Sequence, residues 1–189
     1  MKQIRTFAIA ALLLATVGVL FTPFAMDNGY SWLQNSISET GGQGVTNAWL
    51  GRLTLFLSGT GVLLVVALKL RSWNRTATFA MALFGIMWSL TSFFSTRSWI
   101  QDVPFDEAES ITHSFLASAM AIVVLGALSL GFGRSNVSRK NRALAFLLAF
   151  AATFLPLASL LFPDLAGLFQ RLMFLYTYFW FMREARTGC

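Results

Sequence analysis

The sequence has few residues that carry charge or bind metals. Only 12% of its 189 residues are charged, and it contains one cysteine and one histidine. Because Cys189 is the only cysteine, no disulfide can form within the chain, and we expect this thiol to be reduced in a cytoplasmic segment. Zinc sites usually need several imidazole or thiolate ligands, which this sequence does not supply. We therefore predict neither a metal site nor a cofactor.

Two familiar motifs of enzymes and nucleotide-binding proteins are also missing. The glycine-rich stretch at residues 41–44 lacks the Gly-Lys-Ser/Thr ending that would hold a phosphate. No Gly-x-Ser-x-Gly elbow occurs, and a serine hydrolase would have His113 as its only histidine base. These absences weigh against an enzyme. A metal-dependent intramembrane hydrolase built on His113 and Asp106 is kept as an alternative hypothesis, which would require a bound metal.

Apolar residues are abundant instead. The sequence is 56% hydrophobic, with 19 Phe and 6 Trp, which is far too apolar for a soluble domain of this length. The net charge of +6 does not indicate nucleic-acid binding, because the basic residues occur in short clusters between apolar runs. We predict a protein surrounded by membrane lipids, with no nucleic-acid partner.

Six apolar runs are long enough to cross a bilayer, whose core of about 30 Å needs roughly 20 helical residues. In lipid the backbone must satisfy its own hydrogen bonds, and no alternating pattern favours a barrel, so the runs predict helices. The predicted fold class is all-α, a six-helix transmembrane bundle forming a single domain over residues 1–189. The six predicted helices cover approximately residues 6–26, 48–70, 76–96, 111–132, 142–162 and 165–182.

The first run has an alternative interpretation as a cleaved signal peptide, since Lys2 and Arg5 precede it. The residues that follow Pro23 lack a small-x-small cleavage site, which favours a retained helix.

The distribution of charge predicts the orientation in the membrane. With the N-terminus inside, the inner segments hold eleven of the 14 Lys and Arg residues and one acid, Glu184. The outer segments hold three Arg and seven acids. Every connection contributes in the same direction, as the positive-inside rule requires. Both termini are therefore predicted to be cytoplasmic.

The two longer outer connections are the expected location of any outward-facing chemistry. The first, residues 27–47, contains a capping-box pattern from Ser36 to Glu39, which predicts a short interfacial helix with Trp32 and Trp49 as anchors. The second, residues 97–110, carries four acids and leads into the fourth predicted helix.

Arg171 is the most informative polar residue, because it lies inside the sixth apolar run. An arginine costs about 2.5 to 3.5 kcal/mol at mid-membrane on insertion scales, so its side chain should face protein or water. Gly167, Arg171 and Tyr178 share one helix face at the 100° helical spacing. The alternative is that Arg171 extends to the outer headgroups.

Small and hydroxyl residues recur at helical spacing in two other runs. Gly85, Ser89, Ser92 and Thr96 form a stripe in the third run, and residues 58–61 of the second run include Ser58, Gly59 and Gly61. Such residues favour close helix packing, with a polar cavity as the second interpretation. Pro156 interrupts the fifth run and should kink it, which can open a cavity or be accommodated by neighbouring helices.

Several polar residues are predicted to lie at similar depth in the outer third of the membrane. His113 can be a satisfied structural residue, titrate, or bind a headgroup or a metal. Ion pairs among the set would lower its insertion cost, whereas a surplus of positive charge would favour an anionic ligand. The candidate ligand-binding residues are Arg52, Arg97, His113, Arg171, Glu39, Asp102, Asp106 and Gln170.

Three segments resemble DUF998, a family of six-helix bacterial and archaeal membrane proteins. They are Ser36-Ile37-Ser38-Glu39-Thr40-Gly41, the acidic loop leading to His113-Ser114, and Gly167-Leu168-Phe169-Gln170-Arg171. The loop at residues 103–106 (VPFD) departs from the Phe-Pro-x-Asp order of the family. The resemblance covers nearly the whole chain and implies the helix count, an outward polar cluster and a bacterial or archaeal cell membrane. It implies no reaction.

The favoured hypothesis is a non-enzymatic membrane protein whose outer polar cavity binds, or also moves, an anionic lipid or small molecule. The second hypothesis is an accessory protein that packs through its Phe-rich faces against a membrane-protein partner or another copy of itself. The second hypothesis predicts that purification in mild detergent recovers a stoichiometric partner.

Overall fold

A computed structural model describes residues 1–27, 29–131 and 139–187, with side chains described outside residues 127–142. Phe132 at the end of the fourth predicted helix, Arg134 and Cys189 lie outside the described residues. Within the described part there are seven α-helices and no strand, so the all-α prediction is confirmed. The helices are α1 (Lys2–Phe21), α2 (Ile37–Thr40), α3 (Ala48–Lys69), α4 (Arg75–Leu90), α5 (Glu107–Gly131), α6 (Arg139–Leu161) and α7 (Ala166–Arg186), with 3-10 turns at Thr22–Ala25 and Pro163–Leu165.

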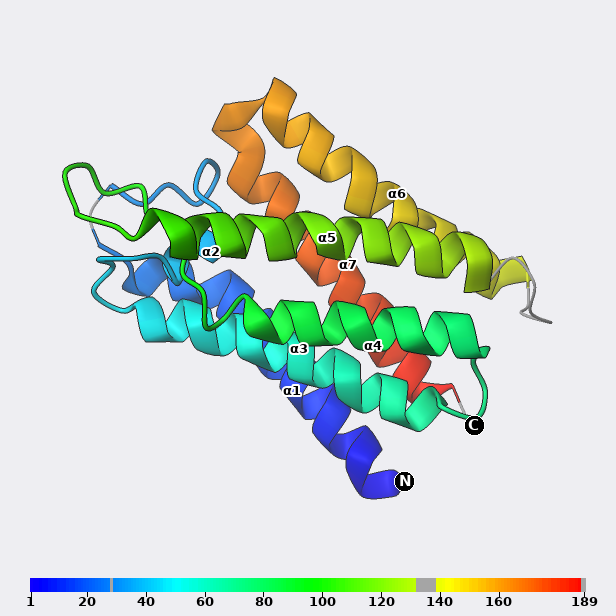
Figure 1. Cartoon of the computed structure of the whole chain (residues 1–189). Helices are drawn as coiled ribbons and strands as arrows, with labels where there is room; N and C mark the ends of the chain where they lie inside the picture. Colours follow the sequence, from blue (N-terminus) through cyan, green and yellow to red (C-terminus); the bar gives the residue numbers. More distant parts are fainter. Residues whose placement is uncertain (28, 132–138, 188–189) are drawn as a thin grey trace.

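The long helices lie side by side as a bundle (Figure 1). α3 packs between α1 and α4, α4 also packs against α5, and α7 packs against α6 and α1. Among the residues that the structure describes, the contact between α5 and α6 is much less extensive. The α1–α3 loop and the α4–α5 loop lie at one end of the bundle, which we call the loop end, and the α3–α4 turn lies at the opposite end (Figure 1).

Four helical segments are long and apolar enough to cross a membrane: Lys2–Ala25, Ala48–Lys69, Glu107–Gly126 and Ala143–Leu161. α4 has 16 residues, which gives a rise of about 24 Å, shorter than a hydrocarbon core of about 30 Å. α7 has 21 residues, but it carries Arg171 and the charged residues Arg183, Glu184 and Arg186. Length and composition therefore support four membrane spans, and the count of six transmembrane helices stays a prediction.

The ends of several helices differ from the predicted ones. α4 ends at Leu90, before the predicted end at 96, because the Thr91 and Ser92 hydroxyls donate to the carbonyl oxygens of Trp88 and Ser89 and stabilise a turn. α5 begins at Glu107, before the predicted start at 111, since the Asp106 carboxylate accepts from the Glu109 N–H at 3.1 Å and satisfies the first turn. α6 continues through Pro156.

Close packing between α3 and α4 uses the small residues that the sequence singled out. A Cβ at Gly59 would lie 2.3 Å from Ser89 Oγ and 2.7 Å from the Gly85 carbonyl oxygen. The two backbones therefore approach more closely than any larger residue would permit. In the same core, the hydroxyls of Ser58 and Tyr178 are both fully buried and lie 2.6 Å apart. The packing interpretation is confirmed for Ser58, Gly59, Gly85 and Ser89, whereas Ser92 and Thr96 lie beyond the end of α4.

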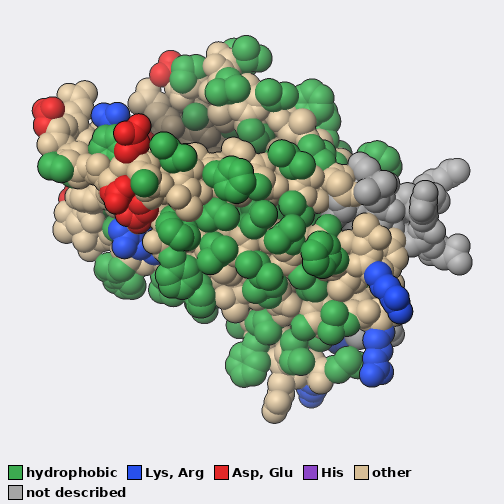
Figure 2. All heavy atoms as spheres, in the orientation of Figure 1, with side chains coloured by type: hydrophobic (Ala, Val, Ile, Leu, Met, Phe, Trp, Pro, Cys, Tyr) green, Lys and Arg blue, Asp and Glu red, His purple; other side chains and the backbone are tan. Residues whose placement is uncertain are grey.

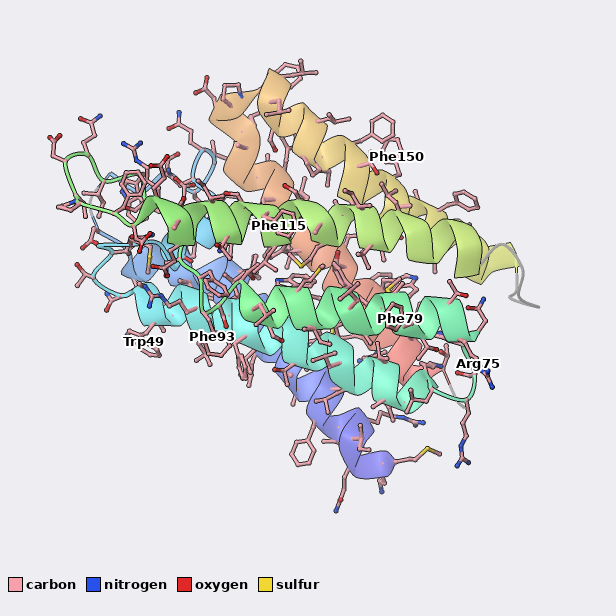
Figure 3. The ribbon with its side chains drawn as sticks, in the orientation of Figure 1. Trp49, Arg75, Phe79, Phe93, Phe115 and Phe150 are labelled. Carbon is pink, nitrogen blue, oxygen red and sulfur yellow. The ribbon has the colours of Figure 1, made fainter. Side chains whose placement is uncertain are left out.

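Large apolar side chains cover the outside of the bundle. Phe79, Phe115 and Phe150 project away from α4, α5 and α6, and Trp49 and Phe93 lie nearer the loop end (Figure 3). In the space-filling view, apolar side chains form a wide belt, acidic ones gather at the loop end, and most basic ones lie at the opposite end (Figure 2). An apolar surface of this extent requires a lipid or protein environment.

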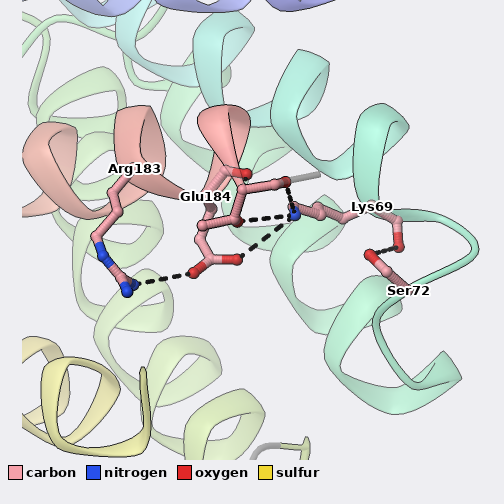
Figure 4. Close-up of polar contacts among 5 residues, drawn as sticks. Lys69, Ser72, Arg183 and Glu184 are labelled. Carbon is pink, nitrogen blue, oxygen red and sulfur yellow. Dashed lines mark hydrogen bonds and ion pairs between the residues drawn. The ribbon is translucent and has the colours of Figure 1, made fainter. Parts of the chain in front are cut away.

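A buried ion pair lies at the end opposite the loops (Figure 4). Lys69 Nζ, at the C-terminus of α3, donates to the Thr187 carbonyl oxygen at 2.6 Å and to the Thr187 hydroxyl at 3.0 Å. It also lies 3.9 Å from the Glu184 carboxylate, whose other oxygen is 3.6 Å from Arg183. The ammonium thus caps the last turn of α7 and joins it to α3.

Candidate functional site

The α1–α3 loop is folded back on itself at the capping box. Ser36 Oγ accepts from the Glu39 N–H at 3.2 Å, and the Glu39 carboxylate accepts from the Ser36 N–H at 2.6 Å. This reciprocal pair satisfies the N-terminus of α2 and confirms the predicted short helix. The Glu39 carboxylate also accepts from the side-chain amide of Asn35 at 3.3 Å. The loop therefore presents a fixed row of backbone carbonyl groups to α7.

Arg171 is the centre of the contact between this loop and α7. Its guanidinium is fully buried, donates to the Asn35 carbonyl oxygen at 2.9 Å and to the Tyr30 hydroxyl, and lies 4.6 Å from the centre of the Trp32 ring. Its Nε has no partner among the described residues. Arg171 therefore faces protein, as predicted, and does not extend to the surface.

Tyr30 is the second residue of this contact. Its single hydroxyl proton is shared between the carbonyl oxygens of Asn35 and Ser36, at 3.2 and 3.0 Å, while the hydroxyl oxygen accepts from Arg171. Burial raises the pKa of the Tyr30 phenol to about 12, and the nearby Arg171 charge offsets part of that effect. The phenol is consequently neutral at physiological pH and acts as a hydrogen-bond relay between the guanidinium and the loop.

The first turn of α7 is held by the same loop. The Gly167 N–H donates to the Gln34 carbonyl oxygen at 3.1 Å, and the Leu168 N–H donates to that of Leu33 at 3.0 Å. A Cβ at Gly167 would lie 2.3 Å from the Asn35 carbonyl oxygen, so only glycine fits there. The donors at this helix N-terminus are therefore already occupied.

Gln170 connects the loop to a cavity between the helices. Its Oε1 accepts from the Ile37 N–H at 2.5 Å, which leaves Nε2 without an acceptor among the described residues. Gln170 and Ser36 line one side of a cavity of about 330 Å³ between α5, α6 and α7. The other lining residues are Ala117, Ser118, Ala121, Leu155, Pro156, Ser159, Ala166 and Met173.

A smaller apolar cavity of about 80 Å³ adjoins the first. Ala117, Ala121, Pro156 and Met173 line both cavities, so the two lie side by side. The smaller one extends between α4, α5, α6 and α7, and its lining includes Trp88, which is 2% exposed. We call the two together the interhelical cavity. It has a polar part beside the α1–α3 loop and an apolar part in the helix layer.

His113 belongs to a separate polar cluster at the start of α5. The residue is buried, and its Nδ1 lies 2.7 Å from the Phe94 carbonyl oxygen. Glu109, one turn earlier, accepts from the Ser95 N–H at 2.5 Å. Gln43 extends the cluster, since its side chain pairs with the backbone N–H and carbonyl of Asp106 at 2.6 and 3.0 Å. These contacts fix the α4–α5 loop against α5.

The other candidate residues lie apart from both clusters. Arg52 is exposed, donates from Nε to the Gly41 carbonyl oxygen at 3.1 Å and borders an open groove with Phe56, Ser92 and Phe93. Arg97 is exposed over the Phe105 ring at 4.9 Å. Asp102 is exposed with a φ of 62°. The structure therefore brings together Glu39, Gln170 and Arg171, places His113 and Asp106 in different contacts at the start of α5, and leaves Arg52, Arg97 and Asp102 outside these clusters.

Sequence reasoning did not identify several residues of this site. Tyr30 and Asn35 hold Arg171 from more than 130 positions away in the sequence. Ser118 and Ser159 line the polar part of the cavity. The two serines could have been found as hydroxyl residues beside alanines in otherwise apolar runs. Such small side chains leave space between their helix and its neighbour.

Within the described residues no group of three or more His, Cys, Asp or Glu side chains could hold a metal ion. The hydrolase alternative built on His113 and Asp106 therefore gains no support from this geometry. His113 instead contacts a backbone carbonyl oxygen, and Asp106 caps α5.

The helices and their apolar outer surface define an α-helical membrane protein. The chain belongs to the DUF998 family, described as a protein of unknown function, whose family model matches residues 8–185. A comparison with curated proteins and one with solved structures found no match.

Proposed function

We propose that the protein crosses the membrane six times, with the loop end outside and both termini in the cytoplasm of a bacterial or archaeal cell. Charge supports this orientation, because basic residues gather at the end opposite the loops (Figure 2). For α7, burial supports a central span, since Arg171 and Tyr178 are fully enclosed by protein and do not meet lipid.

Single cysteines in a Cys189→Ser background test the orientation. A membrane-impermeant maleimide added to intact cells should label Asp102→Cys in the α4–α5 loop. It should label Ser72→Cys, in the α3–α4 turn, only after the membrane is permeabilised. Labelling of Ser72→Cys in intact cells would contradict the orientation.

Within this layout, we propose that the protein binds an amphipathic lipid in the interhelical cavity. The observation that carries the proposal is that the polar part of the cavity, beside Gln170 and Ser36, shares four lining residues with an apolar part that is also lined by Trp88. A molecule with a polar head and a hydrocarbon chain matches both parts. A wholly polar guest would leave the apolar part empty, and a wholly apolar guest would leave the polar groups unpaired.

The cavity is also accessible from the lipid phase. Ala117, Ser118 and Pro156 line it and are themselves exposed, so α5 and α6 do not close over it. Phe115 and Ile122, which flank this face of α5, are 69% and 71% exposed. An acyl chain can therefore enter sideways from the bilayer without crossing water.

Arg171 supports this site without lining it. Its guanidinium donates to Asn35 and Tyr30, and these contacts hold Ser36 and Ile37 against Gln170. The role expected from the sequence, direct contact with an anion, is thus replaced in this proposal by a positioning role. Loss of Arg171 would alter the cavity through the loop.

Photoreactive lipids test the proposed binding. Purified protein in liposomes that contain a lipid with a diazirine in its acyl chain should show labelling on α5 and α6 that saturates and is competed by unlabelled lipid. Ala121→Phe, which fills the junction of the two cavities, should lower this labelling several-fold. Ala10→Phe, the same change at an exposed site of α1, should not lower it. Equal labelling of the two variants would contradict the proposal.

A further inference from the structure

We infer that the interhelical cavity selects lipids with an uncharged head group, such as the glycerol hydroxyl and esters of a diacylglycerol, over lipids that carry a phosphate. This inference rests on the proposed lipid binding. It concerns the chemical class of the ligand, which is decided by the groups at the polar part of the cavity.

The polar lining consists of neutral groups. Ser36, Ser118, Ser159 and Gln170 are the polar residues among the ten that line the larger cavity, and none of the ten is Lys, Arg, Asp or Glu. Gln170 Nε2 can donate to an ester carbonyl or a hydroxyl oxygen. Ser159 donates its own hydroxyl proton to the Leu155 carbonyl oxygen, so its free lone pairs can accept from a ligand hydroxyl.

The nearest cation is not available to a phosphate. Arg171 follows Gln170 in α7, but two of its N–H groups are used by Asn35 and Tyr30, and the side chain is fully enclosed. Glu39, which pairs with Ser36 and Asn35, places a carboxylate on the same side of the loop. The Nε of Arg171 has no partner among the described residues, but it is buried with the rest of the side chain, and Arg171 does not line the cavity.

The N-terminus of α7 does not supply an anion site either. The Ala166 N–H donates to the Pro163 carbonyl oxygen, and those of Gly167 and Leu168 donate to the α1–α3 loop. A helix N-terminus attracts anions through N–H groups that lack partners, and these three have partners. A phosphate in the cavity would lose its hydration without gaining a cation or a free row of donors.

The test compares three lipids that carry the same diazirine acyl chain: a diacylglycerol, a phosphatidylcholine and a phosphatidylglycerol. The diacylglycerol should saturate the α5 and α6 labelling at a concentration at least about tenfold lower than either phospholipid, since a buried phosphate would be left without partners. Equal potency of the three, or a preference for phosphatidylglycerol, would overturn the inference while leaving lipid binding supported. No saturable labelling from any of them would overturn lipid binding itself.

A gain-of-function variant tests the same inference from the opposite direction. Ser118→Lys adds a cation to the cavity lining at an exposed position and should shift the preference towards phosphatidylglycerol. Ser114→Lys, one turn away on α5 and outside the lining, is the matched control and should leave the preference unchanged. Identical preferences in the two variants would also overturn the inference.

Discussion

Arg171 of α7 donates a 2.9 Å hydrogen bond to the backbone carbonyl oxygen of Asn35, a residue 136 positions earlier in the chain. This bond joins the last long helix to the loop that follows the first one. It explains why a cationic side chain is tolerated in an otherwise apolar helix, because the protein supplies the acceptors that lipid lacks. The same contact sets the position of the wall of the interhelical cavity formed by Ser36 and Gln170.

Removal of the Arg171 guanidinium should release the α1–α3 loop. We expect Arg171→Leu to lower the free energy of unfolding by about 1–3 kcal/mol, since acceptors are left with fewer partners. Arg171→Lys retains the charge but not the planar guanidinium, so its stability should lie between those of the wild type and Arg171→Leu. Thermal unfolding and limited proteolysis of the loop in detergent measure both effects. Unchanged proteolysis in Arg171→Leu would contradict the positioning role.

The contact between α3 and α4 should not accept a side chain at Gly59. In Gly59→Ala the new Cβ would lie 2.3 Å from Ser89 Oγ and 2.4 Å from the Ser89 backbone nitrogen, so the helices must separate. We expect a loss of about 1–3 kcal/mol from overpacking. Gly126→Ala is the matched control, because nothing lies within 4 Å of its Cβ, and it should be neutral or slightly stabilising. Equal melting temperatures for the two variants would refute the close contact.

The phenol of Tyr30 should titrate well above an ordinary tyrosine. Burial raises its pKa to about 12 from a usual value of 10.0, so folding favours the protonated form. Its contribution to stability is therefore complete below pH 10 and is lost as the pH rises from 10 towards 12. The difference in tyrosinate absorbance between the wild type and Tyr30→Phe, followed across this range, measures the pKa. A midpoint near 10 would show that the hydroxyl is not enclosed.

The ion pair at the opposite end should couple α3 to α7. Lys69 and Glu184 have side chains that are 4% and 8% exposed, so Lys69→Met would leave a carboxylate buried with one fewer partner. We expect Lys69→Met to lower the free energy of unfolding by about 3 kcal/mol. The double variant Lys69→Met/Glu184→Gln should lose less stability than the sum of the losses in the two single variants. Lys2→Met, at an exposed position, is the control. Strict additivity would show that the two residues do not interact.

The helices could be predicted because each depends on local pattern. Apolar runs of sufficient length placed the long helices, and the Ser36 to Glu39 pattern placed α2 with its reciprocal hydrogen bonds. The early end of α4 was missed because the hydroxyls of Thr91 and Ser92 compete with the helix for backbone carbonyl groups. An apolar pattern alone cannot register that competition.

The candidate site was less predictable because it depends on how helices meet. The sequence marks Arg171 as costly in lipid, but it does not show that Tyr30 and Asn35 supply its acceptors across most of the chain. Depth alone grouped His113 with Arg171, whereas the fold places them in separate clusters on different helices. The cavity lies where the described parts of α5 and α6 make few contacts with each other, and loose packing between two helices has no signature in either helix alone.

A density map of the protein in lipid nanodiscs made from native membranes tests lipid binding most directly. We expect an elongated density in the interhelical cavity, with its broad end within hydrogen-bond distance of Gln170 Nε2 and its narrow end beside Trp88. Side chains of α5 and α6 meeting across an empty, closed interface would contradict it.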